Sequence, residues 1–316
     1  MDNEPKTLSL HLTDLCDSHC VFCVVDAPRQ SSDAIVPDRI KQVLCENAGR
    51  GYGTVNVHGG EPTAHRGFLD ILRLVKSLGY PRVHLQTNGR TLQDLAFVRT
   101  LRELNVELFI VSIHGACATT HDSLTQSPGA LAAVRRAIVN IKQASGRVQT
   151  NTVVMKQNLA ELPAIVDSML DLGVDCINIS CLHPVGTAYS NFDLIAPTMA
   201  ETRKWVPRAV ELAVARSTTV TLEGFPMCAV PLCESYHLGR RPGVISMEFR
   251  GSSIPDYDRF MDEQCRLKGP DCSGCSYHDR CSGVYKEYAM KRGWSEFIPI
   301  RDPSWAATGA EPVGLR

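Results

Sequence analysis

Short apolar segments alternate with longer amphipathic ones along the first two thirds of the chain. The apolar segments predict strands at residues 8–12, 54–58, 82–86, 107–113, 149–154 and 176–180. Between and after them, helical spacing of apolar residues predicts helices at 37–47, 68–78, 92–104, 130–144, 162–172 and 198–216. Strands and helices that alternate in this way form right-handed βαβ units around a parallel sheet. The pattern therefore predicts an α/β fold, either a partial barrel, a full barrel or an open doubly wound sheet.

The pattern changes after about residue 219. Pro, Gly and Cys become frequent, the alternation stops, and six of the thirteen cysteines fall between Cys228 and Cys281. We predict a first domain at residues 1–219 and a separate, metal-stapled module at 220–301 that does not continue the sheet. Residues 302–316 lack periodicity and are predicted to form a tail.

Composition narrows the possible functions. The 316 residues leave room for one large domain and a small appendage, and the net charge of −1 gives no reason to expect nucleic acid or an anionic membrane as a partner. Residues 1–6 do not resemble a signal peptide, and no run of about 18 apolar residues is present to span a bilayer. Thirteen cysteines without a secretion signal favour metal ligation in a reducing compartment. We expect a cytoplasmic protein.

Three cysteines directly follow the first predicted strand. Cys16, Cys20 and Cys23 form a C-x3-C-x2-C loop, which is short enough to direct three thiolates towards one point. Thiolates are the usual ligands of iron–sulfur clusters, and a cubane cluster normally takes four of them. Three ligands would leave one iron of a [4Fe-4S] cluster open. The alternatives are a zinc knuckle, with His19 as its fourth ligand, or unconnected thiols.

A second motif, Gly59-Gly60-Glu61-Pro62, follows the second predicted strand, at the end where barrel active sites gather. Two glycines allow close approach of the backbone to a ligand, and Glu61 can accept a hydrogen bond from an amine. The alternative interpretation is a tight turn. Combined with the cysteine loop one βα unit earlier, and with Phe22 just before its last cysteine, the motif resembles the radical S-adenosylmethionine (radical SAM) superfamily.

The resemblance implies a fold, a cofactor and a set of contacts. The fold would be a partial (β/α)6 barrel, and the open iron would bind the amino and carboxylate groups of SAM. Gly59, Gly60 and Glu61 would hold the methionyl ammonium, and Ser112 would contact the SAM carboxylate. Many relatives carry an Arg three residues after the Asp of a His-Asp pair, but here that position is Thr125, so this contact is lost or supplied elsewhere. An external reductant such as flavodoxin or ferredoxin would supply the electron.

A second cysteine group, Cys272, Cys275 and Cys281, has the spacing C-x2-C-x5-C. It resembles the SPASM/Twitch modules that add auxiliary [4Fe-4S] clusters to radical SAM barrels. A full SPASM pattern continues with a cysteine where this chain has Tyr285, so we expect one auxiliary cluster. Cys228 is the favoured fourth ligand, and the alternatives are Cys265 and Cys233. A structural four-thiolate zinc site is the alternative for the whole module.

Four cysteines fall outside these two groups, namely Cys45, Cys117, Cys176 and Cys181. Free cysteine is commonly buried, so we interpret them as core residues. Cys117 and Cys181 also follow predicted strand ends on the active face. They are therefore candidate catalytic residues, each able to donate a hydrogen atom to a substrate radical.

The predicted function is that of a radical SAM oxidoreductase or maturase. By resemblance, it would cleave SAM reductively to a 5′-deoxyadenosyl radical that abstracts a substrate hydrogen atom, in peptide or natural-product maturation. Because only fifteen residues precede Cys16 in this sequence, we expect no N-terminal leader-binding domain. That observation favours the alternative, a small-molecule dehydrogenase or carbon-skeleton enzyme of secondary metabolism. A non-enzymatic iron–sulfur or zinc protein is a third hypothesis, against which the glycine motif argues.

Overall fold

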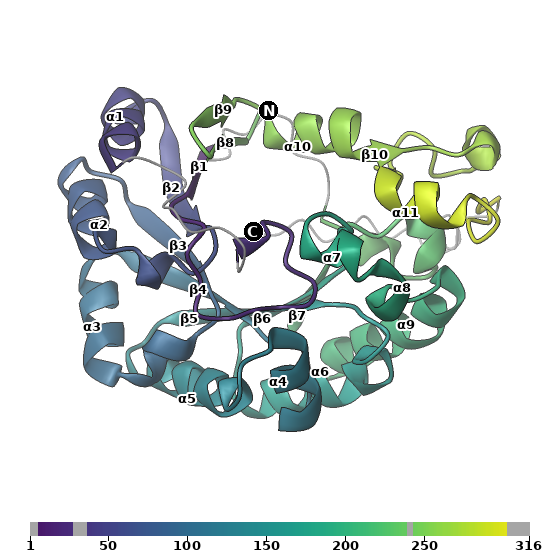
Figure 1. Cartoon of the computed structure of the whole chain (residues 1–316), viewed down its shortest axis with the longest axis horizontal. Helices are drawn as coiled ribbons and strands as arrows, with labels where there is room; N and C mark the ends of the chain where they lie inside the picture. The colour runs from purple at the N-terminus through teal and green to yellow at the C-terminus, as the bar shows by residue number, and fades with distance from the viewer. Residues whose placement is uncertain (1–5, 28–36, 239–242, 302–316) are drawn as a thin grey trace.

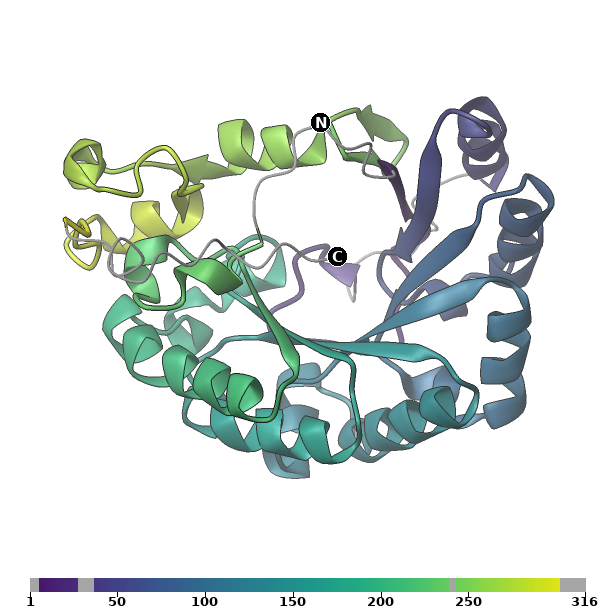
Figure 2. The same ribbon diagram turned by 180° about the vertical axis from the view of Figure 1, so that it is seen from behind.

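The computed structural model describes residues 6–27, 37–238 and 243–301; the predicted tail at 302–316 lies outside them. A curved sheet of nine strands forms the centre, with helices on its outer side (Figures 1 and 2). The strand order is β7-β6-β5-β4-β3-β2-β1-β8-β9. All neighbouring strands from β7 to β8 are parallel, and β9 pairs antiparallel with β8 at one edge. The predicted α/β partial barrel is confirmed.

The strands of this sheet are β1 (Lys6–His11), β2 (Tyr52–His58), β3 (Arg82–Thr87), β4 (Val106–Ser112), β5 (Arg147–Val153), β6 (Cys176–Ser180), β7 (Thr219–Glu223), β8 (Ile245–Phe249) and β9 (Ser252–Ile254). The helices are α1 (Pro37–Asn47), α2 (Phe68–Ser77), α3 (Leu95–Glu103), α4 (Ala118–Thr125), α5 (Ala130–Gln143), α6 (Leu162–Asp171), α7 (Thr187–Ser190), α8 (Phe192–Ile195), α9 (Met199–Ala215), α10 (Tyr257–Phe260) and α11 (Lys286–Arg292). A small antiparallel sheet joins β10 (Arg266–Leu267) to β11 (Val284–Tyr285).

The six predicted strands are present as β1 to β6, and the predicted helices match α1, α2, α3, α5, α6 and α9 within a few residues. The predicted helix at 92–104 begins later because the Asp94 carboxylate caps α3, accepting from the Ala96 N–H at 2.8 Å. A separate short turn, η3 (Arg90–Gln93), precedes this cap. The short helices α4, α7 and α8 were not predicted, because so few turns show no clear apolar period.

The prediction that residues after 219 leave the sheet is wrong. β7 pairs with β6, while β8 pairs with β1 at the other end of the sheet, with Thr7 opposite Ile245. Local periodicity cannot reveal a pairing between segments so far apart in sequence. The segment from α10 to α11 then crosses the open side of the curve (Figure 1). The division into domains at 1–219 and 220–301 therefore stays a prediction, and three strands from beyond residue 218 belong to the main sheet.

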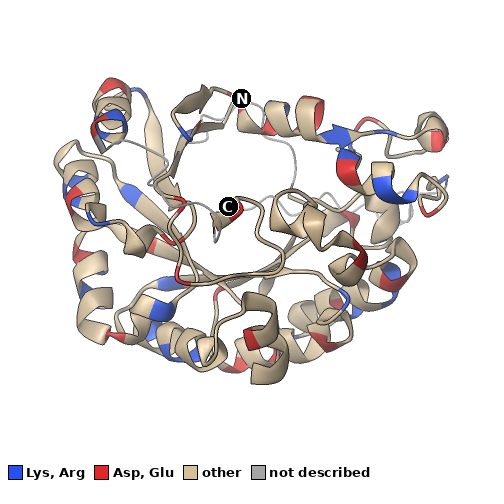
Figure 3. Cartoon of the chain, in the orientation of Figure 1, with Lys and Arg blue, Asp and Glu red and all other residues tan. Residues whose placement is uncertain are grey.

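Charged residues of both signs are interspersed over the outer helices (Figure 3). Within the described part of the chain, no helix has the length and apolar character needed to cross a membrane.

Candidate functional site

The carboxyl ends of the parallel strands open into a cavity of about 520 Å³. This volume lies in the range of roughly 300–1,000 Å³ that small-molecule sites occupy. Its lining combines the cysteine loop, the glycine motif, the strand ends and the C-terminal segment, represented by Cys16, Cys20, Cys23, Gly59, Gly60, Ser112, Asn151, Ser180, Glu223, Tyr257, Arg266 and Tyr285. Residues that the sequence analysis singled out in separate motifs therefore meet in one cavity.

The three thiols of the cysteine loop are partly buried. Burial raises the pKa of Cys16 to about 12. Burial, and then the negative charge of Cys16 and Cys23, also raises the pKa of Cys20. The Ala27 N–H lies 3.4 Å from Cys23 Sγ, a contact of the kind that tunes cluster sulfurs. Buried thiols lose their protons readily only beside a compensating positive centre, so the three donors fit a metal cluster.

A zinc knuckle needs several ligands around one ion. In the described residues, no group of three or more His, Cys, Asp and Glu side chains is arranged to hold a single metal ion. The thiolates of a cubane lie further apart, because iron and sulfide atoms stand between them. Cys16, Cys20 and Cys23 are donors of the kind that an iron–sulfur cluster takes, so a cluster stays the prediction for this loop.

The glycine motif lies directly against the cysteine loop. Gly60 N donates to Thr13 O at 2.7 Å, and Glu61 N donates to Leu15 O at 2.7 Å. A Cβ on Gly60 would lie 2.3 Å from Leu15 O, and one on Gly59, whose φ is +148°, would lie 2.4 Å from Thr13 O. The two glycines are needed for this close approach as well as for the cavity wall.

The segment after β6 supports the other end of the loop. Thr187 N donates to Cys23 O at 2.9 Å, and a Cβ on Gly186 would lie 2.7 Å from that same oxygen. The Phe22 ring packs edge-on against His114, with 4.5 Å between ring centroids. The loop is thus held between the ends of β2, β4 and β6.

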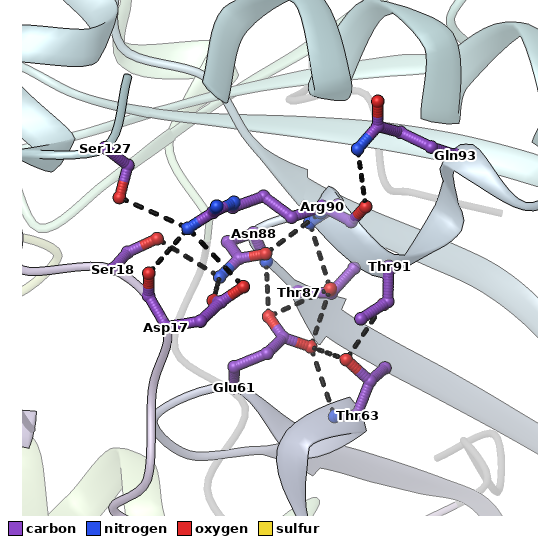
Figure 4. Close-up of polar contacts among 11 residues, drawn as sticks. Asp17, Ser18, Glu61, Thr63, Thr87, Asn88, Arg90, Thr91, Gln93 and Ser127 are labelled. Carbon is purple, nitrogen blue, oxygen red and sulfur yellow. Dashed lines mark hydrogen bonds and ion pairs between the residues drawn. The ribbon is translucent and has the colours of Figure 1, made fainter. Parts of the chain in front are cut away.

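The Glu61 carboxylate is fully buried and joins the end of β2 to the end of β3 (Figure 4). It accepts from Thr63 N at 3.1 Å, Thr63 Oγ1 at 2.7 Å, Thr87 Oγ1 at 2.9 Å and Asn88 N at 2.7 Å. Burial raises the pKa of Glu61, and these hydrogen bonds oppose the rise. Glu61 is not among the residues that line the cavity, so its contact with a methionyl ammonium stays a prediction.

Arg90 was missed by the sequence analysis. It begins η3, directly after the Thr87-Asn88-Gly89 turn, and its side chain lines the cavity (Figure 4). Its Nη1 donates to Asp17 O at 2.6 Å and lies 3.5 Å from the Asp17 carboxylate. Thr125, which replaces the expected arginine, also lines the cavity. The structure thus places a guanidinium beside the cysteine loop from a different element.

Arg250, between β8 and β9, holds the cysteine loop from the far side. Its Nε lies 3.2 and 3.1 Å from the two carboxylate oxygens of Asp14, and its Nη2 donates to Val25 O at 2.7 Å. Asp14 is fully buried and also pairs with His11 Nε2 at 2.7 Å. One side chain therefore contacts the residues on both sides of the three cysteines.

Replacement of Arg250 by Gln is expected to lower the free energy of unfolding by about 1–3 kcal/mol, because the buried Asp14 carboxylate loses its guanidinium partner. Urea unfolding monitored by circular dichroism measures this change. The matched control is Arg216→Gln, whose contacts with Asp167 and Asp171 lie on the surface and should contribute less than about 1 kcal/mol. Equal effects of the two substitutions would contradict the assigned role of Arg250.

The second cysteine group gathers around Cys228, which lies in the short turn η5 (Met227–Ala229). Burial first, and then the negative charge of Cys281, Cys272 and Cys275, raises the pKa of Cys228 to about 12. The pKa of Cys265, by contrast, responds to burial and to the charges of Lys286, Glu287 and Arg266.

The other alternative, Cys233, also has different neighbours. Its pKa is raised to about 12 by burial and then by the charges of Glu234 and Glu211. Backbone N–H groups approach two of the clustered sulfurs, Gly269 N to Cys272 Sγ at 3.2 Å and Gly283 N to Cys281 Sγ at 3.3 Å. Of the three candidates, Cys228 is the one whose pKa responds to the charges of the other three thiols, and its role as fourth ligand stays a prediction.

The cysteines outside the two groups differ in their surroundings. Cys176 is buried as predicted, but Cys45 and Cys117 are exposed, on α1 and just before α4. The prediction that they are core residues is wrong, because they lie on outward-facing parts of these elements. Cys181 lines the cavity, and burial raises its pKa to about 12, whereas Cys117 does not line it. Of the two candidate hydrogen donors, Cys181 lines the cavity and Cys117 does not, and the catalytic role of either stays a prediction.

The structure thus defines a partial barrel with a cysteine loop and a glycine motif at the carboxyl ends of its first strands. Residues 10–169 match the family described as Radical SAM superfamily. The chain belongs to the radical SAM superfamily of enzymes, for which a [4Fe-4S] cluster and SAM are the shared cofactors.

Two curated relatives share about a third of their aligned residues with this chain. The probable GTP 3′,8-cyclase of Sulfurisphaera tokodaii is 30% identical over 192 residues, 60% of this chain and 59% of that protein. The AdoMet-dependent heme synthase of Methanosarcina barkeri is 33% identical over 192 residues, 59% of this chain and 53% of that protein. The chain therefore aligns with between half and three fifths of the length of these relatives.

Among solved structures, Streptococcus suis SuiB bound to its precursor peptide SuiA has a TM-score of 0.68 at 16% identity, covering 94% of this chain and 75% of that one. Native anSMEcpe with bound AdoMet and Cp18Cys peptide has a TM-score of 0.64 at 13% identity, covering 93% and 92%. At these identities the likeness shows a shared fold, and it extends over the C-terminal segment as well as the barrel.

Proposed function

We propose that this protein cleaves SAM reductively and uses the resulting 5′-deoxyadenosyl radical to abstract a hydrogen atom from a substrate bound in the barrel. The observation that carries the proposal is the meeting of Cys16, Cys20 and Cys23 with Gly59 and Gly60 in one cavity. A cluster held by Cys16, Cys20 and Cys23 would leave one iron for a cosubstrate, and the cavity that these residues line would receive it.

Different residues of the cavity wall would contact different parts of SAM. The backbone of Gly59 and Gly60 would hold the methionyl end, and Ser112 and the Arg90 guanidinium would offer donors to its carboxylate. Glu61 would keep the ends of β2 and β3 in register through Thr63, Thr87 and Asn88. When bound, the cluster and SAM supply the radical chemistry, while the protein positions the substrate and excludes water.

The C-terminal residues 220–301 are proposed to carry an auxiliary [4Fe-4S] cluster on Cys228, Cys272, Cys275 and Cys281. Four buried or half-buried thiols with two N–H···S contacts form a donor set that suits such a cluster. This cluster would accept the electron left on a substrate radical, which makes the overall reaction an oxidation or a bond formation.

We propose a peptide or natural-product substrate, in line with the precursor peptide bound by SuiB and the peptide bound by anSMEcpe, both of which share the fold over more than nine tenths of this chain. A small-molecule dehydrogenase or carbon-skeleton enzyme is the second candidate. Asp258, Asp262 and Arg266 line the cavity from the C-terminal segment. Charged side chains of this kind suit a compact polar ligand, which favours the second candidate. The electron would come from an external reductant such as flavodoxin or ferredoxin.

The proposed activity has a direct test. Anaerobically reconstituted protein, incubated with SAM and dithionite, is expected to form 5′-deoxyadenosine and methionine in equal amounts, measured by liquid chromatography and mass spectrometry. Omission of dithionite is the control. A protein that contains its full iron and sulfide and yet forms no 5′-deoxyadenosine would refute the proposed function.

A further inference from the structure

Glu223 ends β7 and is the only Asp, Glu, Lys or Arg that the described strands of the main sheet contribute to the cavity lining. Its Oε2 accepts from Asn178 Nδ2 at 2.9 Å, and Ser180 Oγ lies 3.3 Å from the same oxygen. Its Oε1 accepts no hydrogen bond from the described residues, and the side chain is open to the cavity. One oxygen is thus held by the protein, while the other has no hydrogen bond from the described residues on a side chain that lines the cavity.

A polar network between β5, β6 and β7 sets this orientation. Asn178 Oδ1 is occupied by Thr221 Oγ1 at 2.8 Å, which turns the Asn178 amide nitrogen towards Glu223. The same nitrogen donates to Asn151 Oδ1 at 3.0 Å, and Ser180 Oγ donates to that oxygen at 2.7 Å. A carboxylate oriented by donors in this way presents its remaining oxygen as a hydrogen-bond acceptor.

Charged side chains of both signs line other parts of the cavity. Asp258, Asp262, Arg266 and Arg90 are among its described lining residues, so together with Glu223 the lining carries three carboxylates and two guanidinium groups. Arg266 is already engaged, 3.5 Å from Asp262 Oδ1 and 3.4 Å from Tyr285 Oη, and no ion pair joins it to Glu223. In the described residues no ion pair compensates Glu223, so its carboxylate favours a cationic group over an anionic one.

We propose that the substrate presents a cationic nitrogen, an ammonium or a guanidinium, to Oε1 of Glu223. A charge-assisted hydrogen bond to the Glu223 carboxylate forms there. The inference rests on the proposed function only in naming the ligand a substrate. The nitrogen belongs either to a Lys or Arg side chain of a peptide or to a free amine, and both present the same group to the carboxylate.

Binding to the reconstituted enzyme with SAM, measured by titration calorimetry without reductant, tests this inference separately from SAM cleavage. The probes are n-butylamine, butan-1-ol, butyrate and N-acetyl-lysine N-methylamide. The n-butylammonium ion is expected to bind about tenfold or more tightly than butan-1-ol, and butyrate more weakly than either. Tighter binding of the lysine derivative than of butylamine supports a peptide source, and weaker binding supports a free amine. Equal affinity for the three butyl probes would overturn the proposal.

The substitution Glu223→Gln removes the charge but keeps a carbonyl oxygen for Asn178 and Ser180, so the network is retained. It is expected to weaken butylammonium binding about tenfold or more. The matched control is Glu107→Gln on β4, outside the cavity lining and 3.9 Å from Arg147, which should leave binding unchanged. Thermal unfolding of both variants checks folding. If Glu223→Gln weakens SAM binding but leaves butylammonium binding unchanged, the carboxylate serves SAM and the proposal fails.

Discussion

Replacement of Cys20 by Ser is expected to abolish formation of 5′-deoxyadenosine and to remove about one cluster's iron from the purified protein. A hydroxyl is a poor substitute for a thiolate towards iron, and the remaining Cys16 and Cys23 cannot hold a cubane by themselves. Cys20 lies deep in the loop, where burial and the other two thiolates raise its pKa, so the cluster has to supply the compensating positive charge. Product analysis and iron and sulfide determination measure both losses.

The matched control for this experiment is Cys45→Ser. Cys45 is also a free cysteine near the N-terminus, but it is exposed on α1 and does not line the cavity. This variant should keep full iron content and normal 5′-deoxyadenosine formation. A Cys20→Ser protein that retained both would show that the cluster is bound elsewhere, and the barrel would then lack its assigned chemistry.

The local parts of the site could be predicted from sequence because their chemistry lies in short segments. The cysteine loop and the Gly59-Gly60 turn each follow a strand, and parallel strands bring their carboxyl ends to one edge. The pattern therefore predicted that Cys16, Cys20, Cys23 and the glycines share a site. What it could not predict was that the Glu61 carboxylate turns inward to Thr87 and Asn88, because only the packing of β2 beside β3 shows this.

The parts that were missed depend on contacts between distant segments. β8 pairs with β1 across more than two hundred residues, and this pairing alone brings Arg250 to Asp14. Arg90 and Glu223 lie at strand ends, but nothing in their immediate sequence distinguishes them from ordinary surface charges. Their position on the cavity wall follows from the curvature of the whole sheet. A closer reading of the residues directly after each strand would have included both as candidates.

The choice among three possible fourth ligands for the second cluster is where the structure adds most. Cys228 lies beside Cys272, Cys275 and Cys281, whereas the charged neighbours of Cys265 and Cys233 are residues outside this group. The Arg203 Nε donates to Cys228 O at 2.9 Å, which anchors the turn η5 to α9. A cluster bound by Cys228 and by the three C-terminal cysteines would therefore connect the C-terminal segment to the barrel.

Replacement of Cys228 by Ser is therefore expected to remove about half of the iron while 5′-deoxyadenosine still forms, because the first cluster keeps its three thiolates. Turnover of the true substrate should be lost, since the electron left on the substrate radical has no acceptor. Cys265→Ser is the matched control and should keep both its iron and its turnover. Loss of iron in Cys265→Ser but not in Cys228→Ser would reverse the assignment. Equal loss of SAM cleavage and turnover in Cys228→Ser would mean that the second site stabilises the fold rather than receiving electrons.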